Sequence, residues 1–163
     1  MKKFIKVGAV ALALTASVGT IAPVISQPQT VEAASKTIKS GSLTFYIKKK
    51  QVRKSSLKGK KILVLWVNVT NHGKKTVKSE MLMNYTGVNA YQQVHGKWQE
   101  LTTGATNSSS LIKGLGKMEH NLKPHKTIKN GVIMFTLENR NKVKVEFQKG
   151  YNQITARRYF KVK

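Results

Sequence analysis

The sequence predicts an all-β domain, an antiparallel β-sandwich of about seven strands that follows a cleaved signal peptide. Three observations lead to this fold class. Short runs alternate apolar and polar side chains with a period of two, turn residues separate the runs, and Pro124 is the single proline after residue 33. About seven such runs in about 130 residues are typical of a sandwich, with a partly open barrel as the alternative.

The first 33 residues have the pattern of a secretory signal peptide. Three lysines lie near the start of the chain: Lys2, Lys3 and Lys6. An apolar run follows over residues 7–19, and Val31 and Ala33 mark a cleavage site after Ala33. An uncleaved membrane anchor is the alternative, but the run is short for a spanning helix. We therefore expect residues 34–41 to form a short linker and residues 42–163 to form the domain.

The first two strands are expected at residues 43–54 and 61–71. The two faces of the first strand carry Leu43, Phe45 and Ile47 on one side and Tyr46, Lys48 and Lys50 on the other. The second strand is nearly continuous in apolar residues, as a central strand is. Trp66 lies in its middle and is a candidate core anchor. Alternation leaves a competing core face, made of Leu63, Leu65, Val67 and Val69.

Five further strands are expected at residues 88–94, 97–101, 127–137, 142–148 and 154–162. His95 and Gly96 are predicted to form the two-residue turn of a hairpin between the first two of these strands. Gly131 indicates a bulge or kink in the third. The last strand alternates less cleanly, because Arg158 shares a face with apolar side chains. A bulge at Arg157-Arg158 would restore the alternation.

Residues 103–117 do not follow the strand pattern. The segment TGATNSSSLIKGLGK is rich in Gly, Ser, Thr and Asn without clear periodicity, so we expect a long flexible loop. The neighbouring strand has an apolar second face, made of Ile62, Val64 and Trp66. A dimer contact or a cover supplied by the loop would explain that face.

Three segments carry a resemblance to a known family: GKKILVLWVNVTN, AYQQVHGKWQEL and NLKPHKTIKNGVIMFTL. They resemble exported domains of unknown function from Gram-positive bacteria. Those domains are similar to the immunoglobulin-like sandwich of the mycobacterial secreted immunoprotective antigen. The likeness covers residues 42–147 and implies an immunoglobulin-like sandwich and an exported location, but no activity. His125 stands where the family pattern Leu-x-Pro-Gly-x-Thr has glycine, and histidine tolerates such a turn better than a β-branched residue does.

The sequence offers no catalytic pattern, so we expect a protein that is not an enzyme and uses no cofactor or metal. Cysteine and aspartate are both absent, which excludes disulfides, thiolate metal sites and a lipid-modified cysteine. The glutamates after residue 33 stand apart, whereas a glycosidase needs two carboxylates beside one bond. Glu119, His120 and His125 come closest to a metal-ligand cluster but lack the spacing of one. Ser108-Ser109-Ser110 has no nucleophile elbow, and Gly114 to Lys117 is too short for a P-loop.

Charge is the strongest remaining signal. The chain holds 30 Lys and Arg against 6 glutamates, and loss of residues 1–33 would leave a net charge of +22. Arginine occurs only at Arg53, Arg140, Arg157 and Arg158. Because lysine is a hydrated point charge on a flexible stem, this excess favours diffuse, salt-sensitive attraction over specific nucleic-acid recognition. We expect six residues on the first and last strands to form a polyanion-binding patch: Tyr46, Lys48, Lys50, Arg157, Tyr159 and Lys161. Lysines that protect a sheet edge are the alternative.

Two functions fit these observations. The first is a secreted binding protein retained at the cell envelope by an anionic wall polymer such as teichoic acid. The alternative is a secreted cationic effector that acts on foreign membranes or extracellular nucleic acid. A membrane-active protein favours an amphipathic basic helix, and the sequence offers strands instead. No transmembrane segment is expected after processing, and the envelope hypothesis therefore leads.

Overall fold

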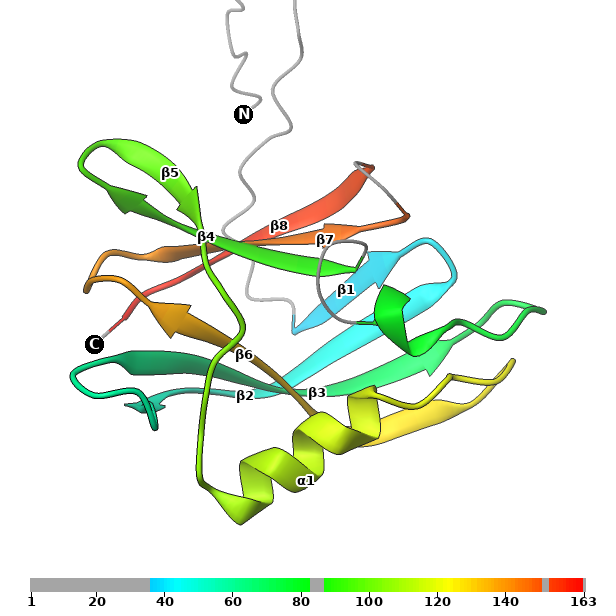
Figure 1. The fold of residues 1–163 in the computed structure, drawn as a ribbon. Helices are drawn as coiled ribbons and strands as arrows, with labels where there is room; N and C mark the ends of the chain where they lie inside the picture. The colour runs from blue at the N-terminus through cyan, green and yellow to red at the C-terminus, as the bar shows by residue number, and fades with distance from the viewer. Residues whose placement is uncertain (1–35, 83–86, 151–152, 163) are drawn as a thin grey trace, which may run out of the picture.

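The structure is a computed structural model that describes residues 36–82, 87–150 and 153–162. Its strands form two four-stranded antiparallel sheets packed face to face (Figure 1). The first sheet has the order β1-β2-β3-β6, with bounds Thr37–Ser40, Leu43–Lys54, Lys61–Asn71 and Thr127–Leu137. The second has the order β5-β4-β7-β8, with bounds Lys97–Glu100, Val88–Val94, Val143–Gln148 and Ile154–Phe160. A 3-10 turn η1 (Ser79–Met81) and a helix α1 (Ser109–Met118) complete the described elements.

This architecture confirms the predicted antiparallel sandwich. Strands β2, β3 and β6 take the places of strands A, B and E of an immunoglobulin domain, and β5-β4-β7-β8 take those of C′, C, F and G. The predicted hairpin is also present. His95 and Gly96 both have positive φ, 49° and 78°, as the two-residue turn between β4 and β5 requires. His125 likewise has a φ of 55°, so the turn keeps the left-handed geometry that glycine provides in the family.

The core lies between the two sheets. Phe45 on β2 and Phe147 on β7 are fully buried, with ring centroids 5.2 Å apart and the ring planes inclined by 59°. On β3, the core face belongs to Leu63, Leu65, Val67 and Val69. Each fully buried side chain of this size contributes about 1.5–3 kcal/mol to folding. Trp66 is half-buried on the other face, so the expectation that it anchors the core is wrong.

Residues 34–41 do not form a simple linker, because Thr37–Ser40 form β1 along the edge of β2. Ile38 and Ser40 turn inward, and Ser40 Oγ donates to the Gln148 carbonyl oxygen at 2.8 Å. Thr155 Oγ1 on β8 donates in turn to Ser40 Oγ at 2.9 Å. The short strand thus ties the first sheet to the edge of the second. Four residues are too few for a period-two pattern to stand out in the sequence.

Two bulges lie at positions that differ from the expected pattern. Register shifts between Ile47 and Lys49, so Lys48 is the extra residue of β2 and the alternation reverses after it. In β8, the shift falls at Thr155, opposite the step from Phe147 to Gln148, and not at Arg157-Arg158. The predicted irregularity near Gly131 is present, since β3 and β6 change register between Val67–Gly131 and Val69–Ile128.

The segment 103–117 is mostly helical, which corrects the expectation of a flexible loop. Helix α1 packs against the outer face of β3 and β6 (Figure 1). A second apolar cluster forms there, made of Ile62, Val64, Leu111, Val132 and Met134, with Trp66 and Leu115 packed against it. The helix is therefore the cover that the apolar second face of β3 required. Its contacts across two strands stabilise a segment whose glycines give it a weak intrinsic helix propensity.

The predicted signal peptide, with its cleavage site after Ala33, lies outside the residues that the structure describes. Among the described residues, no helix is long and apolar enough to cross a membrane.

Candidate anion-binding site

The six residues of the expected patch do not come together on one face. Tyr46 pairs with Asn68 on the outer face of the first sheet, away from the core residue Phe45. Arg157 and Tyr159 pair with Glu146 and Lys144 on the outer face of the second sheet. Because the two outer faces point in opposite directions, the sandwich separates these two halves of the patch.

The lysines of the expected patch have individual partners. Lys48 Nζ donates to Asn130 Oδ1 at 2.6 Å. Lys50 lies on the core-facing side of β2, because the bulge at Lys48 reverses the alternation. Its Nζ donates to the Lys161 carbonyl oxygen at 3.3 Å, which is a direct link between the β2 and β8 halves of the set. The β2 and β8 halves of the expected patch are therefore joined by this one hydrogen bond and do not form a shared surface.

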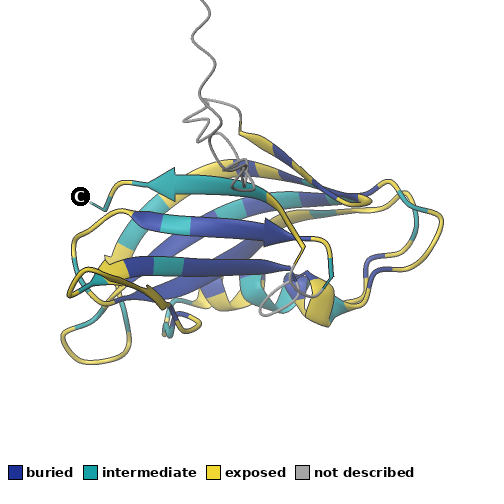
Figure 2. Cartoon of the chain, turned by 90° about the horizontal axis from the view of Figure 1, so that it is seen from above, coloured by how far each residue is buried: buried dark blue, intermediate teal, exposed yellow. Residues whose placement is uncertain are grey.

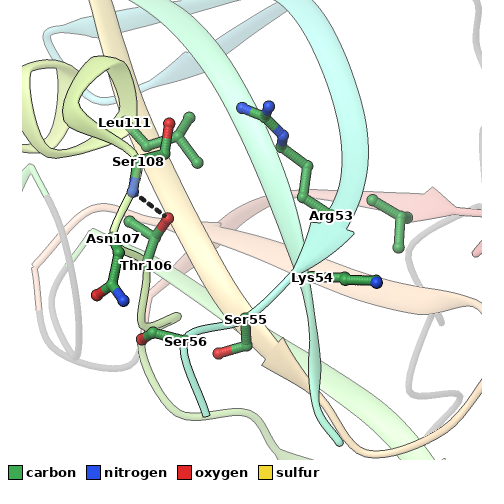
Figure 3. A pocket seen from close by; sticks show the side chains of 9 residues that line it. Arg53, Lys54, Ser55, Ser56, Thr106, Asn107, Ser108 and Leu111 are labelled. Atoms are coloured by element: carbon green, nitrogen blue, oxygen red, sulfur yellow. Dashed lines mark hydrogen bonds between the residues drawn. The ribbon is translucent and has the colours of Figure 1, made fainter. Parts of the chain in front are cut away.

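A pocket of about 460 Å³ lies where β2 ends and α1 begins (Figure 3). Its nine lining residues are Val52, Arg53, Lys54, Ser55, Ser56, Thr106, Asn107, Ser108 and Leu111. Two of these side chains are cationic, four carry hydroxyl groups, one is an amide, and none is a carboxylate. Such a set supplies positive charge and hydrogen-bond donors to one concave surface.

Two loops form the walls of this pocket and are held together by hydrogen bonds. Ser55 Oγ and the Ser56 amide both donate to the Ala105 carbonyl oxygen, at 2.9 and 3.1 Å. On the helix side, the Ser108 amide donates to Thr106 Oγ1 at 3.1 Å. The β2–β3 turn and the entry to α1 are therefore fixed relative to each other, and the polar groups of the pocket are positioned before a ligand arrives.

Arg53 and Lys54 approach the pocket differently. Arg53 pairs with Ile62, which lies under α1, so its side chain is on the helix side of β2; Figure 3 shows the guanidinium extending toward that side. Lys54 pairs with Lys61 and projects to the opposite side of the strand. Arg53 is thus the residue placed to bind a ligand by its planar fork, whereas Lys54 adds charge at the rim.

The surroundings of the pocket favour an anion. The first turn of α1 contains no acidic residue and no side-chain cap, although the Leu111 amide already donates to the Ser108 carbonyl oxygen at 3.0 Å. Glu138 lies on the same side of the sandwich, but Lys60 Nζ neutralises it at 2.6 Å. A phosphate or carboxylate group could therefore accept hydrogen bonds from Arg53 and the hydroxyl groups without a competing carboxylate in the lining.

Sequence reasoning missed this site because it treated residues 103–117 as a loop. A signal was present: Leu111, Leu115 and Met118 recur at helical spacing after Ser108, a residue type that favours helix N-termini. The pocket shows no catalytic arrangement, since its serines and threonines have no histidine or carboxylate among the lining residues. Within the described ranges, no group of three or more histidine or acidic side chains could hold a metal ion.

Comparison with known proteins places the chain in a family. The sequence profile of a domain of unknown function, DUF5067, matches residues 23–149. The chain belongs to the DUF5067 family. A search of curated proteins finds no match. Membership of DUF5067 identifies a domain and brings no assigned reaction, ligand or partner.

Solved structures resemble this DUF5067 chain in fold. A Staphylococcus aureus protein described as a candidate lipoprotein has a TM-score of 0.62 and 16% identity, over 78% of this chain and 88% of its own. An Enterococcus faecalis protein has a TM-score of 0.62 and 18% identity, over 80% of this chain and 92% of its own. A Bacillus subtilis candidate lipoprotein has a TM-score of 0.55 and 12% identity, over 80% of this chain and 39% of its own. At these identities the likeness shows the fold alone, and the suggested similarity to the mycobacterial antigen stays a prediction.

Proposed function

We propose that this DUF5067 protein is a secreted, non-enzymatic binding protein that anionic polymers of the cell envelope retain at the bacterial surface. The observation that carries the proposal is the pocket between β2 and α1, which presents Arg53, Lys54 and five hydroxyl or amide side chains without a carboxylate. Phosphate groups of a wall polymer such as teichoic acid match this chemistry. Arginine binds them by its planar fork, and the hydroxyl groups add hydrogen bonds.

The overall charge supports the same proposal. Among the described residues, ion pairs engage four basic side chains: Lys60, Lys78, Lys144 and Arg157. The acids available to neutralise the others are few, since the whole chain has 6 acidic residues against 30 basic ones. A large excess of exposed lysine therefore attracts a polyanion at long range, and the pocket provides a place for one of its anionic groups.

The descriptions of the structural neighbours are consistent with this proposal. Two of them are described as candidate lipoproteins of Gram-positive bacteria, a class that is held at the cell surface by a lipid. The present sequence has no cysteine, the residue that carries a thioether-linked lipid. Electrostatic attachment to the wall would hold such a domain at the same surface by other means.

The test is a salt-elution experiment on purified Gram-positive cell walls. We expect the mature protein to stay with the walls at about 0.1 M salt and to elute at about 1 M, because the Debye length falls from about 10 Å to about 3 Å. Three double variants remove equal charge: Arg53→Gln with Lys54→Gln, Lys48→Gln with Lys50→Gln, and Lys74→Gln with Lys75→Gln. The first pair should lower the eluting salt concentration most, and the last pair, in an exposed turn, serves as the control.

Four outcomes decide between the hypotheses. Equal shifts in all three variants would show that the charge acts diffusely and that the pocket has no special role. Retention that salt does not change would contradict the electrostatic mechanism. Walls extracted to remove phosphate polymers should no longer retain the protein. Stronger binding to anionic vesicles or DNA than to walls would instead favour the alternative, a secreted cationic effector.

A further inference from the structure

The outer face of the second sheet carries three aromatic rings. Across the strands, Tyr91 on β4 pairs with Lys144 on β7, and Lys144 pairs with Tyr159 on β8. Trp98 on β5 pairs with Gln93, which lies two residues after Tyr91 on the same face of β4. Figure 2 looks down on this sheet, where no described helix lies over β4, β7 and β8. The rings thus lie on an open face, and Trp98 is 43% exposed.

Basic side chains hold these rings in place. Lys144 Nζ lies 4.5 Å from the centroid of the Tyr91 ring and 4.6 Å from that of Trp98. Glu146 Oε1 fixes the same ammonium group at 3.1 Å. On the β8 side, Lys142 Nζ lies 5.2 Å from the centroid of Tyr159. These cation–π contacts restrict the rings before any ligand arrives, which lowers the entropic cost of binding.

A pocket of about 480 Å³ opens beside the rings, within the size range of small-molecule sites. Its lining consists of Val88, Asn89, Glu100, Leu101, Thr102, Thr103 and Phe135. Glu100 is the direct cross-strand neighbour of Tyr91, so this residue links the pocket lining to the ring surface. Asn89 is 8% exposed and lines the pocket. The pocket therefore joins an apolar floor to amide, carboxylate and hydroxyl groups.

The ionisation of Tyr91 fits this surface. Burial raises the pKa of the Tyr91 hydroxyl, and the nearby carboxylates of Glu100 and Glu146 raise it further. The phenol thus stays neutral over the whole physiological range and can both donate and accept a hydrogen bond. This face contains two of the chain's 6 glutamates, Glu100 and Glu146.

We propose that the ring surface of Tyr91 and Trp98, with the adjoining pocket, binds a hexopyranose glycan chain. The C–H face of a pyranose ring is apolar and packs on an aromatic ring, while its hydroxyl groups project from the edge. Asn89, Glu100 and Thr102 offer those hydroxyl groups both donors and acceptors. A neutral sugar suits this combination better than a polyanion, since Glu100 would repel phosphate. The rings lie on the second sheet and the adjoining pocket reaches Phe135 on β6. This site shares no lining residue with the pocket of Arg53 and does not depend on the proposed polyanion function.

The probes are the hexamer of N-acetylglucosamine and cellohexaose, added to the mature protein in 1 M salt. At that ionic strength polyanion attraction is screened, so remaining binding is not electrostatic. The readouts are calorimetry and tryptophan fluorescence. We expect saturable binding of at least one hexamer to the wild-type protein and at least a tenfold loss in Trp98→Ala. Trp98→Phe should retain part of the affinity, because an aromatic ring remains.

The chain provides a matched control in its second tryptophan. Trp66 lies on the opposite outer face, packed against the cluster under α1, and Trp66→Phe should leave the glycan affinity unchanged. Failure of both hexamers to bind at millimolar concentration would overturn the proposal. Equal losses in Trp98→Ala and Trp66→Phe would also overturn it, because they would indicate a general effect on the fold. Salt-sensitive retention on walls is measured separately, so failure of either function is distinguishable from failure of the other.

Discussion

The outer faces of the two sheets differ in what covers them. On the first sheet, β3 exposes an apolar second face, and helix α1 covers it with Leu111 and Leu115. On the second sheet, the equivalent central strand β7 carries Lys144 and Glu146 on its outer face. These two side chains form an ion pair, and Lys144 also contacts neighbouring aromatic rings. No described helix lies over this face.

This difference separates a covered face from an open face, on which we propose a ligand site. Apolar side chains on β3 require a permanent cover, so α1 packs as part of the domain core, and the pocket of Arg53 lies at the start of the helix and not beneath it. Charged and aromatic side chains on β7 and β4 tolerate water and leave their surface open. The sequence shows the same contrast directly, since β3 is nearly continuous in apolar residues and β7 alternates.

The prediction with the largest expected effect concerns Leu111, a buried contact between α1 and the outer face of β3. Leu111 is 1% exposed and packs on Ile62 and Val64, so Leu111→Ala should lower the free energy of unfolding by about 2–4 kcal/mol. Ile112, the next residue along the helix, is 52% exposed and gives a matched control that should change stability by less than about 0.5 kcal/mol. Urea denaturation of both variants measures the difference. Similar small effects would mean that α1 is a peripheral segment and not part of the core.

The strands of the fold could be predicted from the sequence because period-two alternation depends on local residue order. The expected ranges 43–54, 61–71, 88–94 and 127–137 agree with β2, β3, β4 and β6. Helix α1 left a weaker signal, the helical spacing of its apolar residues, because its stability comes from packing on β3 and β6 and not from local propensity. Strand β1 was missed for a related reason. Its four residues are recognisable as a strand only through their pairing with β2.

The candidate site was less accessible to sequence reasoning than the fold. Charge excess is a property of composition and predicted a polyanion partner, which stays a prediction. The location of a site depends on which side of a strand each residue takes, and one bulge at Lys48 was enough to move Lys50 to the other side. Arg53 was recognised only as one of four arginines, because the helix that completes its pocket was not anticipated.

A second test addresses the ion pairs of the open face. Glu146 has a side-chain exposure of 6%, and its Oε1 accepts from Lys144 Nζ at 3.1 Å and Arg157 Nε at 2.9 Å. In Glu146→Gln these two cations lose their counter-charge, and we expect a loss of about 1–3 kcal/mol, reduced from the fully buried case because Arg157 is partly exposed. Glu138→Gln removes an exposed pair with Lys60 and should cost less than about 1 kcal/mol. Equal effects in denaturation experiments would show that this face does not depend on its buried carboxylate.

The smallest test uses two glycines of α1 that differ in what lies next to them. A Cβ at Gly114 would clash with Cγ2 of Val132, a buried β-branched side chain under the helix. Because Val132 has little freedom to move, the clash should outweigh the gain in helix propensity, so Gly114→Ala should destabilise the protein by about 1–2 kcal/mol.

Gly116, two residues later, faces open space, because a Cβ there would have no neighbouring atom within 4 Å. Alanine at this position gains helix propensity without a clash, so Gly116→Ala should stabilise the protein by about 0.5–1 kcal/mol. The opposite signs of the two substitutions follow from the position of the helix over β6, where Gly114 faces the sheet and Gly116 does not. Urea denaturation at one temperature measures both, and changes of the same sign would mean that α1 does not pack closely on Val132. In that case the first sheet would have an open outer face like the second, and the contrast between the two faces would fail.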